Sequence, residues 1–252
     1  VMLRIAALEL PHRFGMPATQ LVALDQCLLG LRGEVDLVVM PETALTGYCS
    51  PQGACDPTAW AEPLDGPTMA QCASLARDHG IALLAPLVED APGPLGPRRY
   101  NSAVLFDAEG ERVGHWRKRH PWHPEKWATP GDLGTPVVSL RGVRLAVAIC
   151  FDIHFVADDA AEALAAADVL LYPSAWVDDD AHDARGPLLS QLAQTHGLWV
   201  VNANWGLGLP RVRGQGGSRI VDPTGREVVR ACATGGARLA RATVGSRRHG
   251  DN

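Results

Sequence analysis

The sequence has little of several features that mark common classes of protein. Its 252 residues contain no apolar run long enough to span a bilayer, and its start, VMLRIAALEL, lacks the charged-then-apolar layout of a signal peptide. The formal net charge of -5 leaves no basic excess for phosphate backbones. We therefore expect neither a membrane nor a nucleic acid as partner, and a small molecule instead.

Cysteine is present, but not in a pattern that binds zinc or builds a disulfide framework. The 6 cysteines are scattered without a CxxC pair, which in a chain of this length indicates reduced thiols and a cytoplasmic protein. His115, His120 and His123 lie near Glu125, but their spacing matches no zinc motif on one helix face. The glycine-rich stretch 206–217 has no GxGxxG signature. We therefore predict no metal and no cofactor.

What the sequence does have is an alternation of two kinds of segment, which favours an α/β fold in one domain over residues 1–244, with 245–252 a flexible tail. Two polar turns ending in glycine, at 108–110 and 223–225, predict β-hairpins and hence mixed sheets. The expected strands are Leu3–Leu8, Asp36–Met40, Ile81–Pro86, Ser102–Phe106, Val143–Ile149, Val169–Tyr172 and Leu198–Val201. The expected helices are Ala18–Leu31, Thr68–His79, Asp158–Ala167 and Pro187–His196.

Three reactive side chains stand where expected strands end. Cys150 follows Val143–Ile149, Glu42 follows Asp36–Met40, and Lys118 closes the second strand of the first hairpin. Each alone has an ordinary explanation as a buried thiol, a loop acid or part of a solvated charge run. Together they supply a nucleophile, a base to deprotonate it, and a cation for the oxyanion that forms when a thiolate attacks a carbonyl. This combination predicts nucleophilic hydrolysis without a metal.

The residues around these three positions are similar to the motifs of the nitrilase superfamily of carbon–nitrogen hydrolases. The resemblance runs from Arg4 to about Val244. The three central motifs are Pro41-Glu42 with Gly47-Tyr48, Tyr100-Asn101-Ser102 leading to Arg117-Lys118-Arg119-His120, and Ile149-Cys150-Phe151-Asp152. Later matches are the stretches 172–176, 201–204, 217–218 and 222–225.

This resemblance implies a four-layer αββα sandwich that forms a homodimer or a higher homo-oligomer. It implies that Glu42 is the general base, that Cys150 forms a thioester, and that Lys118 and the backbone N–H of Phe151 hold the oxyanion. The expected reaction is hydrolysis of a linear carboxamide or an N-carbamoyl compound, releasing ammonia or an amine. The expected substrate-pocket residues are Tyr48, His154, Trp176 and Asn202.

The sequence departs from the family pattern at two places. Many members carry a second active-site glutamate before a Pro-Gly pair. Glu125 precedes Pro130-Gly131, but an ungapped match would put Pro124 at that position, so Glu125 is an auxiliary candidate only. The cysteine motif often continues to an arginine where this chain has His154, which affects how a substrate carboxylate is held.

Two other functions compete with the amidase hypothesis. A nitrilase would use the same three residues on a C≡N group. A protein of another class, a catalytically inactive binding or scaffold protein, would keep the fold without the chemistry. The presence of all three catalytic residue types argues against the second alternative, and an unusually reactive Cys150 would exclude it.

Overall fold

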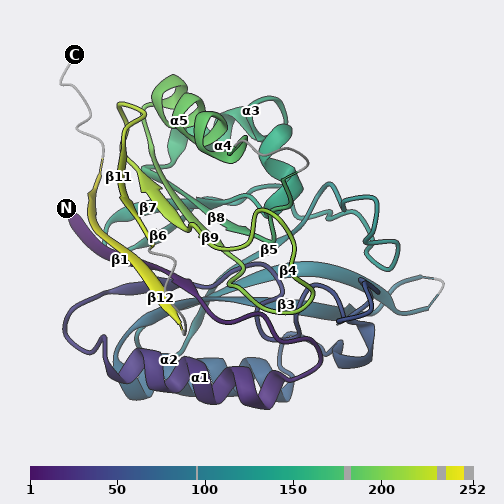
Figure 1. Ribbon diagram of the computed structural model, residues 1–252. Helices are drawn as coiled ribbons and strands as arrows, with labels where there is room; N and C mark the ends of the chain where they lie inside the picture. Colours follow the sequence, from purple (N-terminus) through teal and green to yellow (C-terminus); the bar gives the residue numbers. More distant parts are fainter. Residues whose placement is uncertain (95, 179–182, 232–236, 247–252) are drawn as a thin grey trace.

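The computed structural model describes residues 1–94, 96–178, 183–231 and 237–246. Two six-stranded mixed sheets pack face to face, and helices cover the outer face of each (Figure 1). In that view helices α1 and α2 lie below the sheets, and α3, α4 and α5 lie above them. The chain therefore has the four-layer αββα sandwich in a single domain, which confirms the predicted fold class.

The first sheet contains Glu42 and Lys118 at its strand ends. Its strand order is β12-β1-β2-β3-β4-β5. Helices α1 (Pro17–Leu29) and α2 (Pro67–His79) cover its outer face. The strands are β1 (Met2–Glu9), β2 (Leu37–Val39), β3 (Ala82–Ala91), β4 (Arg98–Phe106), β5 (Arg112–Arg117) and β12 (Arg238–Gly245).

The second sheet leads to Cys150, which lies just beyond one of its strands, and its strand order is β11-β10-β9-β8-β7-β6. The strands are β6 (Val138–Leu140), β7 (Val143–Val147), β8 (Val169–Ser174), β9 (Trp199–Asn204), β10 (Arg219–Val221) and β11 (Glu227–Arg230). The helices on its outer side are α3 (Val156–Asp159), α4 (Ala161–Ala166) and α5 (Arg185–His196). Two 3-10 helices complete the fold, η1 (Thr58–Trp60) and η2 (Cys150–His154).

Local sequence signals explain where the two helices of the first layer begin and end. Both start with proline at the first helical position, where its missing N–H costs no hydrogen bond. Helix α2 ends at Gly80, whose φ of 65° is the left-handed conformation that glycine adopts without strain. Leu21, Leu24 and Leu28 then form a buried stripe on α1, at the spacing of one helix face.

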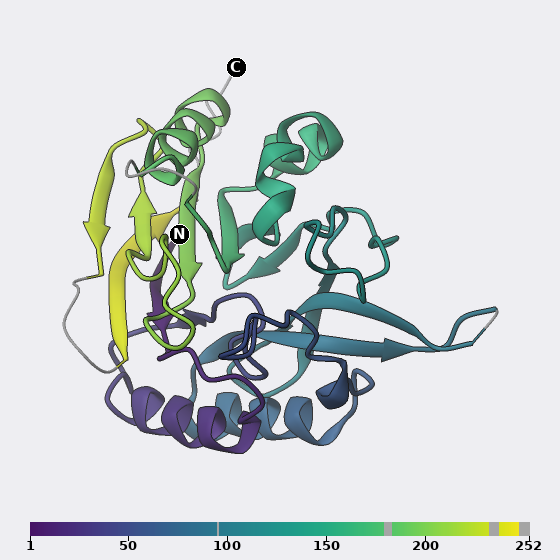
Figure 2. The ribbon, with the colours of Figure 1, turned by 45° about the vertical axis from the view of Figure 1, so that its right-hand side comes forward.

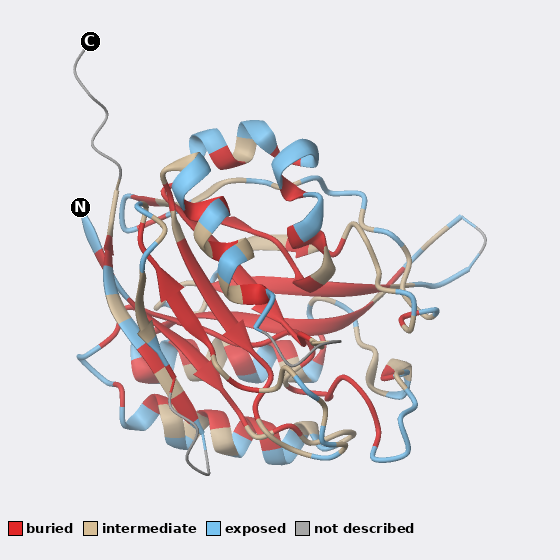
Figure 3. Ribbon diagram, turned by 45° about the horizontal axis from the view of Figure 1, so that its top comes forward, coloured by how far each residue is buried: buried red, intermediate tan, exposed pale blue. Residues whose placement is uncertain are grey.

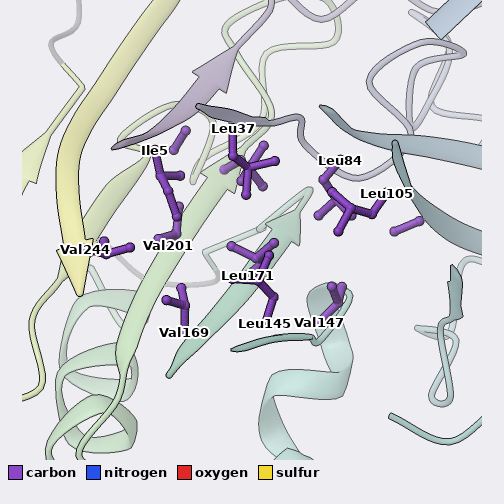
Figure 4. Close-up of a cluster of buried hydrophobic side chains, with 14 of the residues drawn as sticks. Ile5, Leu37, Leu84, Leu105, Leu145, Val147, Val169, Leu171, Val201 and Val244 are labelled. Carbon is purple, nitrogen blue, oxygen red and sulfur yellow. The ribbon is translucent and has the colours of Figure 1, made fainter. Parts of the chain in front are cut away.

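The main hydrophobic core lies between the two sheets (Figure 4). Ile5, Leu37 and Leu84 from the first sheet face Leu145 and Leu171 from the second, and all are at most 1% exposed. Burial of this kind stabilises a fold by roughly 25 cal/mol for each Å² of apolar surface removed from water. Figure 3 shows the result, with buried strands at the centre and exposed residues on the outer helix faces.

The seven expected strands and the two expected hairpins are present, with some differences in extent. Strands β3 and β4 also form a hairpin, and it extends well beyond the body of the molecule in Figure 2. The single helix predicted over Asp158–Ala167 is wrong, because the chain breaks into α3 and α4 at Ala160. Strands β6 and β12 were not predicted.

The first two residues of the expected tail, 245 and 246, lie against the first two residues of the chain. Gly245 pairs with Met2 at the end of β12, and the Ser246 N–H donates to the Val1 carbonyl at 3.1 Å. The remainder of the expected tail, 247–252, lies outside the described residues, as does Cys232. Within the described ranges, the helices are too short or too polar to cross a membrane.

Candidate active site

Glu42 and Lys118, which are 76 positions apart in the sequence, meet at one edge of the sandwich. Glu42 follows β2 and Lys118 follows β5, and the Lys118 Nζ lies 2.6 Å from the Glu42 Oε1. Cys150 follows β7 of the opposite sheet, close enough for the charges of both residues to act on its thiol. All three side chains are buried. The structure therefore brings together the three residues that the sequence placed at strand ends.

The backbone around Cys150 holds the cysteine in an uncommon conformation. Its φ of 48° is rare for a residue with a side chain, and it begins the 3-10 helix η2. The Asp152 carboxylate fixes this turn by accepting hydrogen bonds from the backbone N–H groups of Ile149, Arg119 and His120. Because Arg119 follows Lys118, these bonds tie the cysteine segment to the lysine segment.

Both carboxylate oxygens of Glu42 have hydrogen-bond donors. Oε1 accepts from Lys118 Nζ and from Asn101 Nδ2, at 2.6 and 2.7 Å. Oε2 accepts from the Ala175 backbone N–H at 2.9 Å, at the end of β8. A buried carboxylate with three donors is held in one orientation. Glu42 is thus fixed to both sheets.

Glu125 lies in the same cluster, on the other side of the lysine. Its two carboxylate oxygens are 2.9 and 2.7 Å from Lys118 Nζ, and the Trp122 N–H donates to Oε2 at 2.6 Å. Asn101 Nδ2 donates to both Glu125 and Glu42. The irregular spacing before Pro130-Gly131 therefore does not remove Glu125 from the site.

Burial and mutual charge determine how these groups ionise. Burial raises the pKa of the Cys150 thiol well above its ordinary value, and the Glu42 charge adds to this effect. Burial also raises the pKa of Glu125, to about 7. Burial opposes the charge on Lys118, but Glu42, Cys150 and Glu125 outweigh it and raise the lysine pKa. The site thus holds an ammonium and a thiol that needs a base.

Three of the four expected pocket residues lie around this cluster. Tyr48 is buried, and burial with the charges of Glu125 and Glu42 raises the pKa of its phenol. Trp176 follows Ala175, and its ring lies 5.7 Å from that of the exposed His154 in η2. Phe151 packs edge-on against His154. An aromatic wall therefore adjoins the cysteine segment.

Asn202, the fourth expected pocket residue, lies within the second sheet. Its Nδ2 donates to the Tyr172 carbonyl and to the Ser174 hydroxyl, both at 2.9 Å. Asn202 and Tyr172 are register partners in β9 and β8, so their side chains share a face, and Tyr172 packs in the cluster beneath helix α5. Asn202 therefore joins two strands on the side of the sheet away from the inter-sheet core.

Two groups at the site were not singled out by sequence reasoning. Asn101 was noticed only as part of a motif, and the Ala175 N–H is a backbone donor that carries no residue-type signal. Within the described ranges, no three or more His, Cys, Asp or Glu side chains are grouped so that they could hold a metal ion. The side chains of His115 and His120 bind the carboxylates of Glu89 and Asp159, respectively.

Comparison with known proteins identifies the family. The carbon-nitrogen hydrolase profile matches residues 4–246. An (R)-stereoselective amidase of Pseudomonas sp. is 32% identical over 231 residues, covering 91% of this chain and 81% of that one. The N-carbamoylputrescine amidase of Solanum lycopersicum is 35% identical over 134 residues, covering 50% of this chain and 43% of the relative.

Solved structures agree with this assignment. A mutant of the Nesterenkonia AN1 amidase, from the nitrilase superfamily, superposes with a TM-score of 0.78 at 27% identity, covering 95% of this chain and 90% of that one. Another mutant of that amidase, at 26% identity with a TM-score of 0.76 over the same shares of the two chains, carries a covalent addition of the acetamide moiety of fluoroacetamide at its active site cysteine. This chain belongs to the carbon-nitrogen hydrolase family, within the nitrilase superfamily.

Proposed function

We propose that this protein hydrolyses the C–N bond of a linear carboxamide or an N-carbamoyl compound through a thioester on Cys150. The observation that carries the proposal is the buried cluster in which Lys118 bridges Glu42 and Glu125 beside the cysteine. The amidase relatives of this chain support an amide as the substrate. The covalent addition at the cysteine of the Nesterenkonia amidase supports a thiol nucleophile.

In the acylation step, the Glu42 carboxylate takes the proton of the Cys150 thiol as sulfur attacks the carbonyl carbon. A base is needed because the raised pKa of Cys150 leaves the thiol protonated near neutral pH. The tetrahedral intermediate then collapses, the C–N bond breaks, and Glu42 passes its proton to the departing nitrogen. The products of this step are the Cys150 thioester and ammonia or an amine.

The developing oxyanion has two proposed donors. Lys118 contributes its Nζ, which burial keeps out of water and two carboxylates keep charged. The Phe151 N–H contributes the second bond, because the first N–H groups of a helix have no partner within it and Phe151 is the second residue of η2. Glu42 then activates a water molecule, which attacks the thioester and releases the acid.

Intact-protein mass measurement is the direct test of the nucleophile. Wild type and Cys150→Ala would be incubated with a panel of amides, N-carbamoyl compounds and nitriles, while released ammonia is assayed. We expect an acyl adduct and ammonia release with wild type only. The absence of both across the panel, with no preferential alkylation of Cys150, would favour the inactive scaffold; turnover of nitriles alone would favour a nitrilase.

Glu42→Gln tests the base separately. Glutamine keeps the shape and can still accept hydrogen bonds from Lys118 and Asn101, but it cannot take a proton. We expect turnover to fall by at least about 100-fold, which is within the range for removal of a general base. Circular dichroism and urea unfolding would check that the fold remains. A variant with the wild-type kcat would show that another residue is the base.

The cellular setting and the assembly are also proposals. We infer a cytoplasmic homodimer or a higher homo-oligomer, supported by the free thiols in the described part of the chain and by the resemblance to the superfamily. Light scattering of the purified protein would measure the assembly. A monomer at micromolar concentration would contradict it.

A further inference from the structure

Cys49 and Cys55 lie opposite each other across a tight turn that follows the Glu42 segment. The Ser50 N–H donates to the Ala54 carbonyl at 2.8 Å, and the Gly53 N–H donates to the Ser50 carbonyl at 2.8 Å. The Ser50 hydroxyl accepts the Ala54 N–H at 3.1 Å, closing the other side of the pair. Gly53 has a φ of 86°, which lets the chain reverse there. Ser50 and Ala54 thus form a hydrogen-bonded pair at the base of a turn.

The next two residues outward from this pair are the cysteines. The Ser50–Ala54 hydrogen bonds close the base of the turn, so they bring the flanking residues Cys49 and Cys55 together from the two arms of the loop. A disulfide requires Cα atoms roughly 4.4–6.8 Å apart. The closed turn therefore favours a bond between the two sulfur atoms.

The side chains agree with the backbone. Burial raises the pKa of the Cys49 thiol, and the two thiols lie close enough for the charge of Cys55 to add to that shift. The Cys55 thiol donates to the Gly53 carbonyl within the same turn. Both pack in one cluster with Tyr48 and Trp205. Cys55 is the more exposed of the two, whereas Cys49 is 5% exposed. One sulfur is thus open to a small oxidant, and its partner packs in the same cluster.

We propose that Cys49 and Cys55 are a modification site at which peroxide forms a reversible disulfide. Burial raises the pKa of Cys55 as well, so only a small fraction of it is thiolate near neutral pH. That thiolate attacks one peroxide oxygen, giving a sulfenic acid and, after proton transfer, water. The Cys49 sulfur then attacks the Cys55 sulfur and expels the sulfenic oxygen as a second water. Two thiols and one hydrogen peroxide become one disulfide and two waters, so atoms and electrons balance.

The position of the pair connects this modification to the site. Cys49 adjoins Tyr48 in the chain, and the charge of Glu125 acts on both Tyr48 and Cys55. A disulfide brings two sulfurs to about 2.05 Å, which moves the backbone beside Tyr48. A displacement on the order of 1 Å at an active site costs up to about 100-fold in rate. We expect oxidation to lower kcat/KM on the order of tenfold.

The chemical test uses the Cys150→Ala variant, so that the nucleophile does not react. The reduced full-length protein is treated with hydrogen peroxide, quenched with catalase, denatured, alkylated with N-ethylmaleimide and digested for tandem mass spectrometry. We expect the peptide containing both cysteines to lose two hydrogen masses and to carry no label at Cys49 and Cys55, while Cys72 in the same peptide is labelled. Dithiothreitol should restore both labels.

Matched variants make the outcome decisive. Cys49→Ser in the same background should instead accumulate sulfenic or sulfinic acid at Cys55. Retention of both labels after peroxide, or sulfinic acid at Cys55 with Cys49 present, would overturn the proposal. This readout needs no turnover, so it succeeds or fails independently of the proposed amidase activity.

The functional consequence needs the active enzyme. Wild type and Cys49→Ser/Cys55→Ser would be compared before peroxide, after it, and after dithiothreitol. Peroxide also attacks Cys150, so both proteins lose activity. The effect of the disulfide is the part of the activity loss that dithiothreitol reverses in wild type but not in the double variant. Equal reversible losses in both proteins would mean that the disulfide does not affect the site.

Discussion

Glu42 and Glu125 bind the same ammonium, yet their surroundings differ. Glu42 receives the Ala175 N–H from the second sheet, whereas Glu125 receives only donors from its own side of the site, at Asn101, Lys118 and Trp122. Burial raises the pKa of Glu125 to about 7, and the Glu42 charge adds to the shift. Two carboxylates in one site with different surroundings are suited to different roles. Glu42 suits proton transfer, and Glu125 suits control of the lysine.

Glu125→Gln tests this assignment. The change removes one of the two negative charges on Lys118, so the oxyanion donor is held less firmly and kcat should fall by about tenfold or more. The pH profile gives the sharper readout. If the ionised form of Glu125 is required, kcat/KM of wild type rises as pH passes through about 7, and the variant lacks this rise.

Glu109→Gln is a suitable control, because Glu109 is exposed in the β4–β5 turn. It should keep the wild-type profile. If Glu125→Gln kept both the wild-type kcat and the rise near neutral pH, the carboxylate would have no part in the reaction and would serve only to fill the site.

Whether the sequence could predict a group at the site depended on the type of that group. Glu42, Lys118 and Cys150 were predictable, because reactive side chains after apolar runs stand out and strand ends meet at one edge. The Ala175 N–H was not, because any residue supplies it. The place of Asn202 in a substrate pocket stays a prediction; strand alternation puts its side chain on the helix-covered face of the second sheet.

At the scale of elements, β3, β4 and β5 share a buried charged network centred on Glu89. The Glu89 carboxylate accepts from Ser102 Oγ, His115 Nε2 and Arg117 Nε at 2.7, 2.9 and 3.0 Å. Burial raises the pKa of Glu89, but these hydrogen bonds outweigh it and lower the pKa to about 2. The network joins three strands next to Lys118, so it contributes to the position of the lysine.

Glu89→Gln should destabilise the protein by about 3 kcal/mol at neutral pH, because it leaves a mostly buried Arg117 with only Asp132 as an ionic partner. A carboxyl whose pKa is lowered on folding adds stability above its unfolded value, 4.5, and that stability is lost as pH falls toward about 2. Urea unfolding of both proteins at neutral and acid pH measures this. A deficit that did not shrink in acid would contradict the ionic explanation.

Some strands could be predicted from their own residues and others could not. Continuous aliphatic runs such as Val169–Tyr172 predict buried strands directly, and β8 contains that run. Strand β12 reads RLARATVG, in which arginine and threonine interrupt the apolar positions. It is nevertheless half buried, because it pairs with β1 along eight residues. Its partner, rather than its own sequence, determines its conformation.

At the scale of the whole molecule, segments from both ends of the chain meet beside the site. Glu9 Oε1 accepts the Ser218 N–H at 2.5 Å, and β1 pairs with β12 in Figure 1. His12 extends this junction. Its Nε2 accepts the Tyr48 N–H and its Nδ1 contacts the Leu209 carbonyl, both at 3.0 Å. One imidazole therefore links the N-terminal segment, the loop carrying Tyr48 and the loop after β9.

This arrangement requires neutral His12 with its proton on Nδ1, because Nε2 must accept a hydrogen bond. Burial lowers the pKa of His12 below 6.5, against the opposing effect of the Leu209 carbonyl. A histidine with a lowered folded pKa binds its proton more weakly in the folded state. Its neutral form therefore gives full stability above about 6.5, and that stability is lost as pH falls below this value.

His12→Gln should reduce this pH dependence, since glutamine can accept the Tyr48 N–H at every pH. Urea midpoints measured from about pH 8 to about pH 5 should fall more steeply for wild type than for the variant. His123→Gln, at an exposed position, should follow wild type. Because His12 binds the loop that carries Tyr48, KM should also rise in wild type over the same acid range and stay flatter in His12→Gln. Parallel pH curves for the two proteins would show that His12 does not titrate as this junction requires.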